Sequence, residues 1–450
     1  MRPESRDWGL GIGDSAPPAN RQTVRLREAG RYALRACLLL LLVCLGQLAQ
    51  ASQDPAPSQS PIPNLQSPPE ISLLTIGPGP VYFERFGHNA IVVRGGGETL
   101  AYNYGMFDFE EEDFFLNFIR GRMRYRIAVS ELADDLAWYR QEGRSIVEQP
   151  LELAPAEALE LAGFLAWNAR PENAWYRYDY FVDNCSTRVR DALDRALGGL
   201  LRQESHGRSR GFTYRLDALR LMAPQPALML AIDLGLGPFA DQRIDYWQES
   251  FVPMTLQQVV GTLRRGDDDV AGRPLASATI ERAAGSVEEP PVLPPDLRVP
   301  FLLLGAAAGA LIAWLGRFRR AAVRVPLASF AVLFQLACGL GGLVLLLLWF
   351  GTEHRAAWRN ENLLLLDPLC LALVPAWLGV ARGRRRARPL AVALSSFVVL
   401  VAGFALFSKI LPWFAQANLH WILLLLPIHL ALGLTLARAS TPARITPSAA

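Results

Sequence analysis

The stretch that decides the fold reads Asn89-Ala-Ile-Val-Val-Arg-Gly-Gly-Gly-Glu-Thr-Leu-Ala-Tyr-Asn-Tyr104. Two runs rich in apolar residues, 89–94 and 99–104, flank the glycines at 95–97. This pattern predicts a β-hairpin, because strands favour β-branched and aromatic residues and glycine adopts the backbone angles of tight turns. The run Ile71-Ser-Leu-Leu-Thr-Ile76 predicts a strand before it, and 145–153 predicts one after it.

Helical segments follow the hairpin. Their predicted ranges are 130–140 with Ser130 as N-cap, 155–168 with a proline near its start, and 185–197. In the last of these, apolar residues recur at helical spacing, and Asp183 and Asn184 precede it as natural caps. Strands and helices in this arrangement predict an α+β domain, a small antiparallel sheet with packed helices.

Composition divides the 450 residues into soluble and membrane parts. Residues 52–70 and 286–298 are rich in proline and read as linkers, so we expect a folded domain at 71–285, here called the exported domain. The following region, 299–437, is strongly apolar and is here called the membrane domain. The net charge of +3 gives no indication of nucleic-acid binding.

Charge and hydropathy predict how the chain crosses a membrane. Basic residues, an apolar run at 36–45 and Ala49-Gln-Ala51 predict a signal peptide over 1–51, or alternatively a retained anchor. Five apolar segments are long enough to span a bilayer, at 299–316, 326–350, 363–381, 389–411 and 419–437. Arginines follow the first, third and fifth, so these ends and the tail 438–450 belong in the cytosol. The exported domain then lies outside the cytosol, on the outer face of the membrane.

Cys185 is the one cysteine of the soluble region. The others, in apolar segments, are Cys37, Cys44, Cys338 and Cys370. Without a disulfide partner, Cys185 is either inert or a working thiol. Cys185 lies at a predicted helix N-terminus, where the helix dipole and unpaired backbone N–H groups should stabilise a thiolate. The same N–H groups could stabilise an oxyanion.

A thiol nucleophile needs a base, and the exported domain has two histidines. We favour His88, at the start of a strand beside Gly87, over His206 in a polar segment. A third group should orient the imidazole, and Asn103 on the neighbouring strand is favoured over Asp108. One cysteine and one histidine do not make a common structural zinc site, so no metal is expected. A purely structural histidine and a buried inert cysteine form the alternative.

Candidate substrate-binding residues surround this pair. Arg120 and Arg122 suit a phosphate headgroup or a carboxylate, or alternatively a solvated surface. Tyr180 and Asn184 lie beside the nucleophile in the sequence. His354 lies in the loop 351–362, on the same side of the membrane as Cys185, where it lines a lipid entry or simply anchors the loop.

Several motifs together carry a family resemblance. They are Phe86-Gly-His-Asn-Ala90, Tyr102-Asn-Tyr-Gly-Met-Phe-Asp-Phe109, Gly143-Arg-Ser145, Tyr178-Asp-Tyr-Phe-Val-Asp-Asn-Cys-Ser-Thr-Arg188, Thr352-Glu-His-Arg355 and Asn360-Glu-Asn-Leu-Leu364. Over 71–265 the chain resembles the periplasmic N-terminal domain of Lnb-type lipoprotein N-acyltransferases, and the membrane part is also similar. That family is related to NlpC-type and lecithin:retinol acyltransferase-like thiol enzymes.

The resemblance implies a permuted papain-like α+β domain followed by an all-α domain of five transmembrane helices. It implies a cofactor-free acyl transfer through a Cys185 thioester, with a membrane phospholipid as donor and a lipoprotein N-terminal amine as acceptor. In the lecithin:retinol branch the third catalytic residue is typically histidine, which this chain lacks on the strand after His88. An NlpC-like peptidase or amidase, a phospholipase or thioesterase, and a non-catalytic membrane-anchored binding module are the alternatives.

Overall fold

A computed structural model describes residues 67–107, 113–266, 272–383 and 388–440. The predicted signal segment, most of the first linker and the end of the tail lie outside these residues. The exported and membrane domains both fall within one compact unit, residues 58–450.

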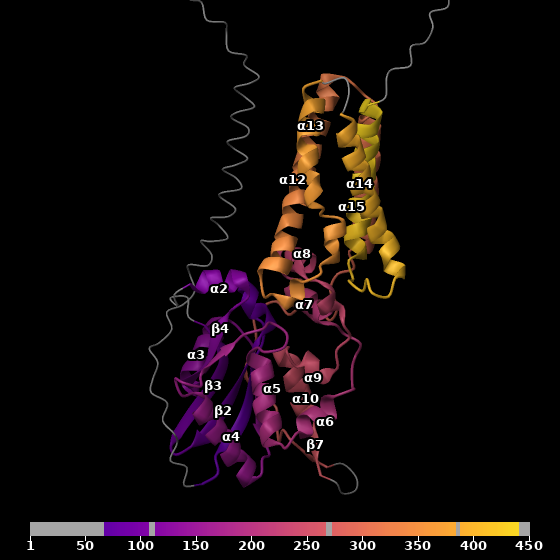
Figure 1. The fold of residues 1–450 in the computed structure, drawn as a ribbon. Helices are drawn as coiled ribbons and strands as arrows, with labels where there is room; N and C mark the ends of the chain where they lie inside the picture. Colours follow the sequence, from indigo (N-terminus) through magenta and orange to yellow (C-terminus); the bar gives the residue numbers. More distant parts are fainter. Residues whose placement is uncertain (1–66, 108–112, 267–271, 384–387, 441–450) are drawn as a thin grey trace, which may run out of the picture. The chain divides into compact units, whose positions relative to one another are not determined.

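A seven-stranded sheet, antiparallel throughout, forms the centre of the exported domain (Figure 1). The strands lie in the order β6-β4-β3-β2-β1-β5-β9. Their bounds are β1 Glu70–Ile76, β2 His88–Gly95, β3 Glu98–Met106, β4 Arg124–Glu131, β5 Ile146–Leu151, β6 Trp175–Arg177 and β9 Ile280–Ala283. The predicted hairpin is confirmed as the central pair β2–β3, in which Ala90 lies opposite Asn103.

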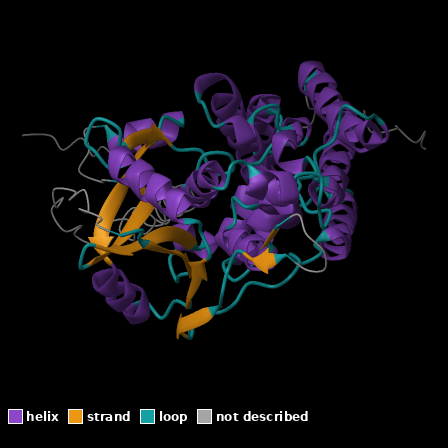
Figure 2. Ribbon diagram, turned by 90° about the horizontal axis from the view of Figure 1, so that it is seen from below, coloured by secondary structure: helices purple, strands orange, loops and turns teal. Residues whose placement is uncertain are grey.

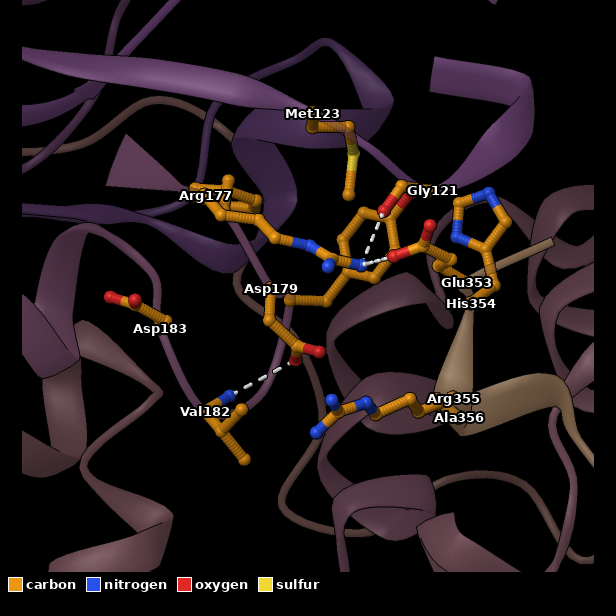
Figure 3. A pocket seen from close by; sticks show the side chains of 12 residues that line it. Gly121, Met123, Arg177, Asp179, Val182, Asp183, Glu353, His354, Arg355 and Ala356 are labelled. Atoms are coloured by element: carbon orange, nitrogen blue, oxygen red, sulfur yellow. Dashed lines mark hydrogen bonds and ion pairs between the residues drawn. The ribbon is translucent and has the colours of Figure 1, made fainter. Parts of the chain in front are cut away.

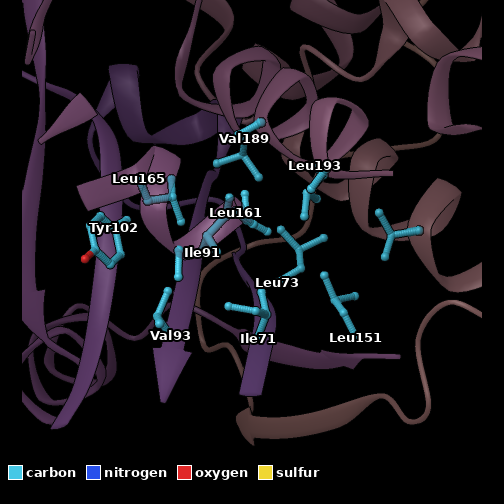
Figure 4. Close-up of a cluster of buried hydrophobic side chains, with 14 of the residues drawn as sticks. Ile71, Leu73, Ile91, Val93, Tyr102, Leu151, Leu161, Leu165, Val189 and Leu193 are labelled. Carbon is cyan, nitrogen blue, oxygen red and sulfur yellow. The ribbon is translucent and has the colours of Figure 1, made fainter. Parts of the chain in front are cut away.

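Helices cover both faces of this sheet (Figure 2). On one face, Leu73 and Ile91 pack against α4 (Pro155–Asn168), α5 (Cys185–Ala196) and α10 (Pro253–Thr262), as Figure 4 shows in part. On the other face, Leu74 and Val92 pack against α3 (Leu132–Gln141). Because successive side chains of a strand point to opposite faces, burial of both faces explains the unbroken apolar run in β2.

The remaining helices of the exported domain are short. They are η2 Tyr82–Phe86, α2 Phe114–Arg120, α6 Leu200–Ser205, α7 Tyr214–Met222, α8 Pro226–Gly235, η3 Pro238–Asp241 and α9 Tyr246–Glu249. A two-stranded sheet pairs β7 (Arg264–Arg265) with β8 (Arg273–Pro274). The predicted α4 and α5 are confirmed, and the domain is α+β in the sense expected from the sequence.

The predicted start of α3 was wrong. Ser130 belongs to β4, a strand that the sequence did not reveal, and α3 begins at Leu132 after the N-cap position Glu131. The strand also fixes where the Ser130 hydroxyl lies, 3.0 Å from Asn103 Nδ2.

The membrane domain contains four helices long and apolar enough to span a bilayer, counted over the residues that the structure describes. They are α11 Arg298–Leu315, α12 Ala321–Gly351, α14 Pro389–Phe407 with η7 Ser408–Ile410, and α15 Leu419–Ser440. The third predicted span, 363–381, is not one helix. It is part of a broken segment, η4 Arg355–Ala357, η5 Glu361–Leu364, η6 Pro368–Leu373 and α13 Val374–Ala381, bent by 42°. Asp367 accepts a hydrogen bond from Leu369 N and Pro368 follows it, which together start a new helix inside the apolar run.

Polar side chains of the broken segment bind the exported domain. Asn360 Nδ2 donates to the carbonyls of Leu234, Gly235 and Leu236 at 2.9, 3.0 and 3.2 Å, which are the last carbonyls of α8 and its C-cap. Asn362 Nδ2 donates to Leu234 O at 3.0 Å. Gln416 Nε2 also donates to Asn360 Oδ1 at 3.1 Å, so the loop between α14 and α15 meets the loop 351–362 at the exported domain.

Candidate active site

Cys185 is the first residue of α5, and Asn184 is its N-cap. Asn184 Oδ1 accepts from Thr187 N at 2.9 Å, and its Nδ2 donates to the carbonyls of Phe251 and Tyr180 at 2.8 and 3.1 Å. The Asn184 side chain is thus fully engaged in capping α5 and joining it to its surroundings. These bonds give Asn184 a structural role, and its contact with substrate stays a prediction.

Two strands hold Cys185 from the sheet side. The Ser186 hydroxyl lies 2.8 Å from Asn89 Oδ1, which joins α5 to β2 one residue after His88. Gly105 of β3 has φ +88°, and a Cβ placed there would lie 3.0 Å from the Cβ of Cys185. Glycine at position 105 therefore allows β3 to approach the cysteine two residues after Asn103.

His88 is the first residue of a hydrogen-bonded row of side chains. Its Nε2 lies 3.0 Å from Asn103 Oδ1, and Asn103 Nδ2 donates to Asp135 Oδ2 at 2.8 Å. A carboxylate accepts and does not donate, so Asp135 fixes which end of the Asn103 amide faces His88. His88 Nε2 must then carry the proton, which leaves Nδ1 as the free acceptor of the ring.

The thiol is less acidic than we expected. Burial raises the pKa of Cys185 to about 11, against the opposing influence of the backbone N–H groups of Asn89 and Ser186 and the charge of Arg144. The prediction of a thiolate at the helix N-terminus is therefore wrong for this state, because loss of solvation outweighs the helix end. The N–H groups that oppose burial are the same groups that suit an oxyanion.

Burial also keeps His88 neutral. It lowers the pKa of His88 to about 4, while the Asn103 hydrogen bond raises it and the Arg144 charge lowers it further. His88 and Cys185 are not hydrogen-bonded to each other. The resting pair is consequently a thiol and a neutral imidazole held in the same corner of the domain, not a preformed ion pair.

The segment that precedes Cys185, residues 177–183, lines a cavity of about 200 Å³ (Figure 3). Its lining residues come from two parts of the chain. They are Gly121, Met123, Arg177, Tyr178, Asp179, Tyr180, Val182 and Asp183 of the exported domain, and Glu353, His354, Arg355 and Ala356 of the loop after α12. Burial and then the neighbouring Cys185 raise the pKa of Tyr178, so this lining residue lies within electrostatic range of the thiol, which does not itself line the cavity.

His354 and Tyr180 lie together in this wall. Their rings stack at a centroid distance of 5.9 Å and an interplanar angle of 16°, and His354 Nε2 lies 2.9 Å from Phe118 O. Burial lowers the pKa of His354, so the ring is neutral and donates from Nε2 to that carbonyl. Both predicted residues therefore belong to the cavity, although His354 also fastens its loop to the exported domain.

The two predicted arginines differ. Arg122 Nε donates to Glu353 Oε1 at 2.7 Å, and Arg177 forms an ion pair with the same carboxylate. Arg122 thus already has an anionic partner within the chain. Figure 3 shows the ion pair of Arg177 with the same carboxylate. Arg120 is exposed, and its backbone carbonyl accepts from Glu353 N at 2.8 Å.

The remaining candidates lie elsewhere. His206 is exposed, with its Nδ1 2.9 Å from Asp245 Oδ2, at the end of α6. Asp108, the alternative to Asn103 as the group that orients His88, lies outside the described residues, so its position relative to His88 is not described.

Sequence reasoning missed three neighbours of the catalytic candidates. Asp135 and Ser130 orient Asn103, and Arg144 lies buried with Nε donating to Gly77 O at 3.0 Å. Asp135 directly follows Asp134 in the first turn of a helix, where acidic residues are common, and this gives no sign of its contact with Asn103. Arg144 stands in the quoted Gly143-Arg-Ser145 motif, and that motif was the available signal.

Two family models match the chain. The model described as the Lnb N-terminal periplasmic domain matches residues 67–225, and that described as the Lnb transmembrane domain matches residues 297–440. Together they cover about two thirds of the sequence, in the order of the exported and membrane domains. No curated protein and no solved structure matches the chain.

Proposed function

The chain belongs to the Lnb family, as a membrane protein with a periplasmic domain, and from this premise we propose that it is a thiol acyltransferase acting on lipoproteins. The observation that carries the proposal is the row His88–Asn103–Asp135 beside a cysteine at a helix N-terminus. A cysteine, a histidine and a group that orients the imidazole are the parts that covalent acyl transfer requires. The membrane in question would be the bacterial inner membrane, with the site on its periplasmic face.

The fold supports a permuted papain-like arrangement in this proposal. The histidine lies on a strand of the central sheet and precedes the cysteine helix in the chain, with the orienting amide on the adjacent strand. The third position, which is typically histidine in the lecithin:retinol branch, would here be Asn103.

In the first half-reaction the Cys185 sulfur attacks the ester carbonyl of a membrane phospholipid. The thiol proton passes to Nδ1 of His88 in the same step, since neither group is charged at rest. Backbone N–H groups of Asn89 and Ser186 face the sulfur and would stabilise the developing oxyanion. Cleavage of the ester bond returns that proton to the departing alkoxide, which leaves as a lysophospholipid, and Cys185 keeps the acyl group as a thioester.

In the second half-reaction the free amine of a lipoprotein N-terminus attacks the thioester carbonyl. His88 takes a proton from the amine and returns it to the departing thiolate, which yields the amide and the original thiol. The reaction needs no metal or cofactor for its atom balance. A hydrolase on the same site would differ only in accepting water in place of the amine.

The test uses the full chain in phospholipid vesicles with a synthetic lipopeptide that carries a free N-terminal amine. Intact-mass analysis should find an acyl adduct on Cys185 that disappears when lipopeptide is added, together with an N-acylated peptide. Cys185→Ala should form neither product, and His88→Gln should form the adduct far more slowly. An adduct that decays equally fast without the peptide would identify a hydrolase, and no adduct in the unaltered protein would refute the proposal.

A further inference from the structure

Among the residues that the structure describes, the exported domain carries an exposed apolar face on α2 and at η2. On α2, Phe115, Leu116 and Ile119 are 51%, 39% and 58% exposed, while Phe114 and Phe118 on the same helix turn inward to other aromatic rings. At the start of η2, the N-cap residue Val81 and the helix residues Tyr82 and Phe83 are also exposed. We call these six residues the apolar face.

The two parts of the apolar face belong to one aromatic cluster. The ring of Phe83 lies 5.9 Å from that of Phe107, and Phe107 lies 5.9 Å from Phe114, the neighbour of Phe115. An exposed apolar surface of this kind marks an interaction site in a soluble domain.

Hydrogen bonds place this surface at the end of a membrane span. The C-terminal end of α2 is joined to the two residues that follow Thr352: Glu353 N donates to Arg120 O at 2.8 Å and His354 Nε2 to Phe118 O at 2.9 Å. The span α12 ends at Gly351, and α2 and α12 are both labelled in Figure 1. Two or three residues of chain reach at most about 10 Å, so α2 lies at the level where α12 leaves the bilayer.

The same end of α12 carries the markers of a membrane interface. Trp349 and Phe350 stack there at 4.6 Å, and Phe350 is 74% exposed. Aromatic side chains gather where apolar and hydrated regions of a bilayer meet. Helices with an apolar face lie in this zone with that face about 5–10 Å into the acyl boundary, which matches the position of α2.

A row of rings leads from the apolar face toward the nucleophile. Phe114 follows Phe115 at 5.5 Å, then Phe107 at 5.9 Å, and Tyr125 lies 5.1 Å from Phe107. Tyr178, in the wall of the cavity, lies 4.2 Å from Tyr125. The rings thus form a continuous apolar row from the apolar face to the wall of the cavity.

We propose that the apolar face inserts into the outer surface of the bilayer beside α12, and that acyl chains enter from there along the row of rings to Cys185. The insertion stands on the contacts with the end of α12, whereas the entry route rests on the acyl transfer proposed above. A lipid surface is the occupant because the face is joined to a span at the depth where lipid surrounds it.

Insertion is tested with the full chain in phosphatidylcholine nanodiscs. A nitroxide is attached at Ile119→Cys in a Cys185→Ser background, and the same background without the added cysteine supplies the signal to subtract. Leu159→Cys on α4 is the matched control, an exposed apolar helix position at 44% exposure that has no bond to the membrane domain. The label at 119 should be accessible to oxygen and protected from a water-soluble nickel complex, while that at 159 shows the reverse; equal nickel accessibility would overturn the insertion.

The route is tested by the rate of Cys185 acylation in Ile119→Asp, with Leu159→Asp as control. Loss of one buried apolar side chain should slow acylation from vesicle phospholipid about tenfold in Ile119→Asp. A short-chain phospholipid dissolved as monomers should acylate both variants at the unaltered rate, which also proves that each is folded. If vesicle phospholipid acylates the unaltered protein and Ile119→Asp at the same rate, the entry route is wrong. If neither donor acylates the unaltered protein, the proposed acyl transfer itself fails, and the nanodisc result still tests the insertion by itself.

Discussion

Removing the Asp135 carboxylate should slow catalysis through Asn103 alone. In the present orientation Asn103 Oδ1 faces His88 and Nδ2 donates to Asp135 at 2.8 Å and to Ser130 at 3.0 Å. A flipped amide would point its oxygen at the carboxylate and its NH₂ group at His88 Nε2. The ring would then have to carry its proton on Nδ1, which is the wrong tautomer for accepting a proton from Cys185.

The magnitude follows from the hydrogen bond that is lost. A hydrogen bond to a charged group contributes about 1.5–3 kcal/mol, and each 1.4 kcal/mol is about a factor of ten. Since Ser130 still accepts from Nδ2, we expect the lower end of this range, a decrease of about tenfold in the rate of Cys185 acylation for Asp135→Leu. Asp135→Asn retains an accepting oxygen and should lose less, so it serves as the conservative control.

The assay is single-turnover formation of the acyl adduct, followed by intact mass, for Asp135→Leu, Asn103→Leu and the double variant. If Asp135 acts only through Asn103, the double variant should react at the rate of Asn103→Leu. The reasoning would be refuted if the fold-decreases in acylation rate of the two single variants multiplied in the double variant. It would also be refuted if Asp135→Leu were acylated at a rate within twofold of the unaltered protein. Thermal melting of each variant separates these results from a loss of folded protein.

Three further predictions concern the thiol and its base. Gly105→Ala and Gly97→Ala both force alanine to positive φ, near +88° and +87°, at a cost in folding free energy of about 1–2 kcal/mol each. Only an alanine at position 105 would contact Cys185, so the rate of Cys185 acylation should fall in Gly105→Ala and not in Gly97→Ala. Equal acylation rates in the two variants would contradict this. Because burial raises the pKa of Cys185 to about 11, its alkylation by iodoacetamide should keep rising with pH beyond 9, and a plateau below pH 8 would contradict the buried thiol. The pKa of His88 is lowered to about 4 from an ordinary value of 6.5, so between pH 6.5 and pH 4 this residue binds a proton in the unfolded chain and not in the folded chain. The free energy of unfolding should therefore fall as the pH drops from 6.5 to 4, by about 3 kcal/mol from this residue. Melting curves of His88→Gln should lack that part of the decline.

Local patterns predicted those parts of the fold that depend on neighbouring residues. The hairpin β2–β3 and the helix α5 were both predicted correctly because alternation, turn glycines and capping act over a few residues. The strand β4 was missed: Arg124 and Arg126 alternate with Tyr125 and Ile127 as in a strand, but the sequence analysis considered only the preceding arginines, Arg120 and Arg122, as a binding cluster. The break in the third span was missed because hydropathy averages over Asp367 and Pro368.

In the candidate site too, features that depend on nearby residues were predicted, and features that depend on distant segments were not. Cys185, His88 and Asn103 were identified from residue type and strand order, and the structure brings them to one corner of the sheet. The raised pKa of Cys185 was not predictable, because burial depends on how Tyr178 and other distant segments pack around the sulfur. Asp135 lies 32 positions from Asn103, and nothing local to either residue indicates the contact.

The capping of α8 by the membrane domain has a consequence for biogenesis. Leu234 and Asn360 are 126 positions apart, and the carbonyls that end α8 find their donors in a loop that is synthesised much later. Asp233, at the same end of α8, likewise accepts from Trp421 Nε1 at 2.7 Å. The end of α8 can therefore reach the state seen here only after the loop that carries Asn360 and the helix that carries Trp421 have been synthesised and placed, so complete folding of the exported domain depends on the membrane domain.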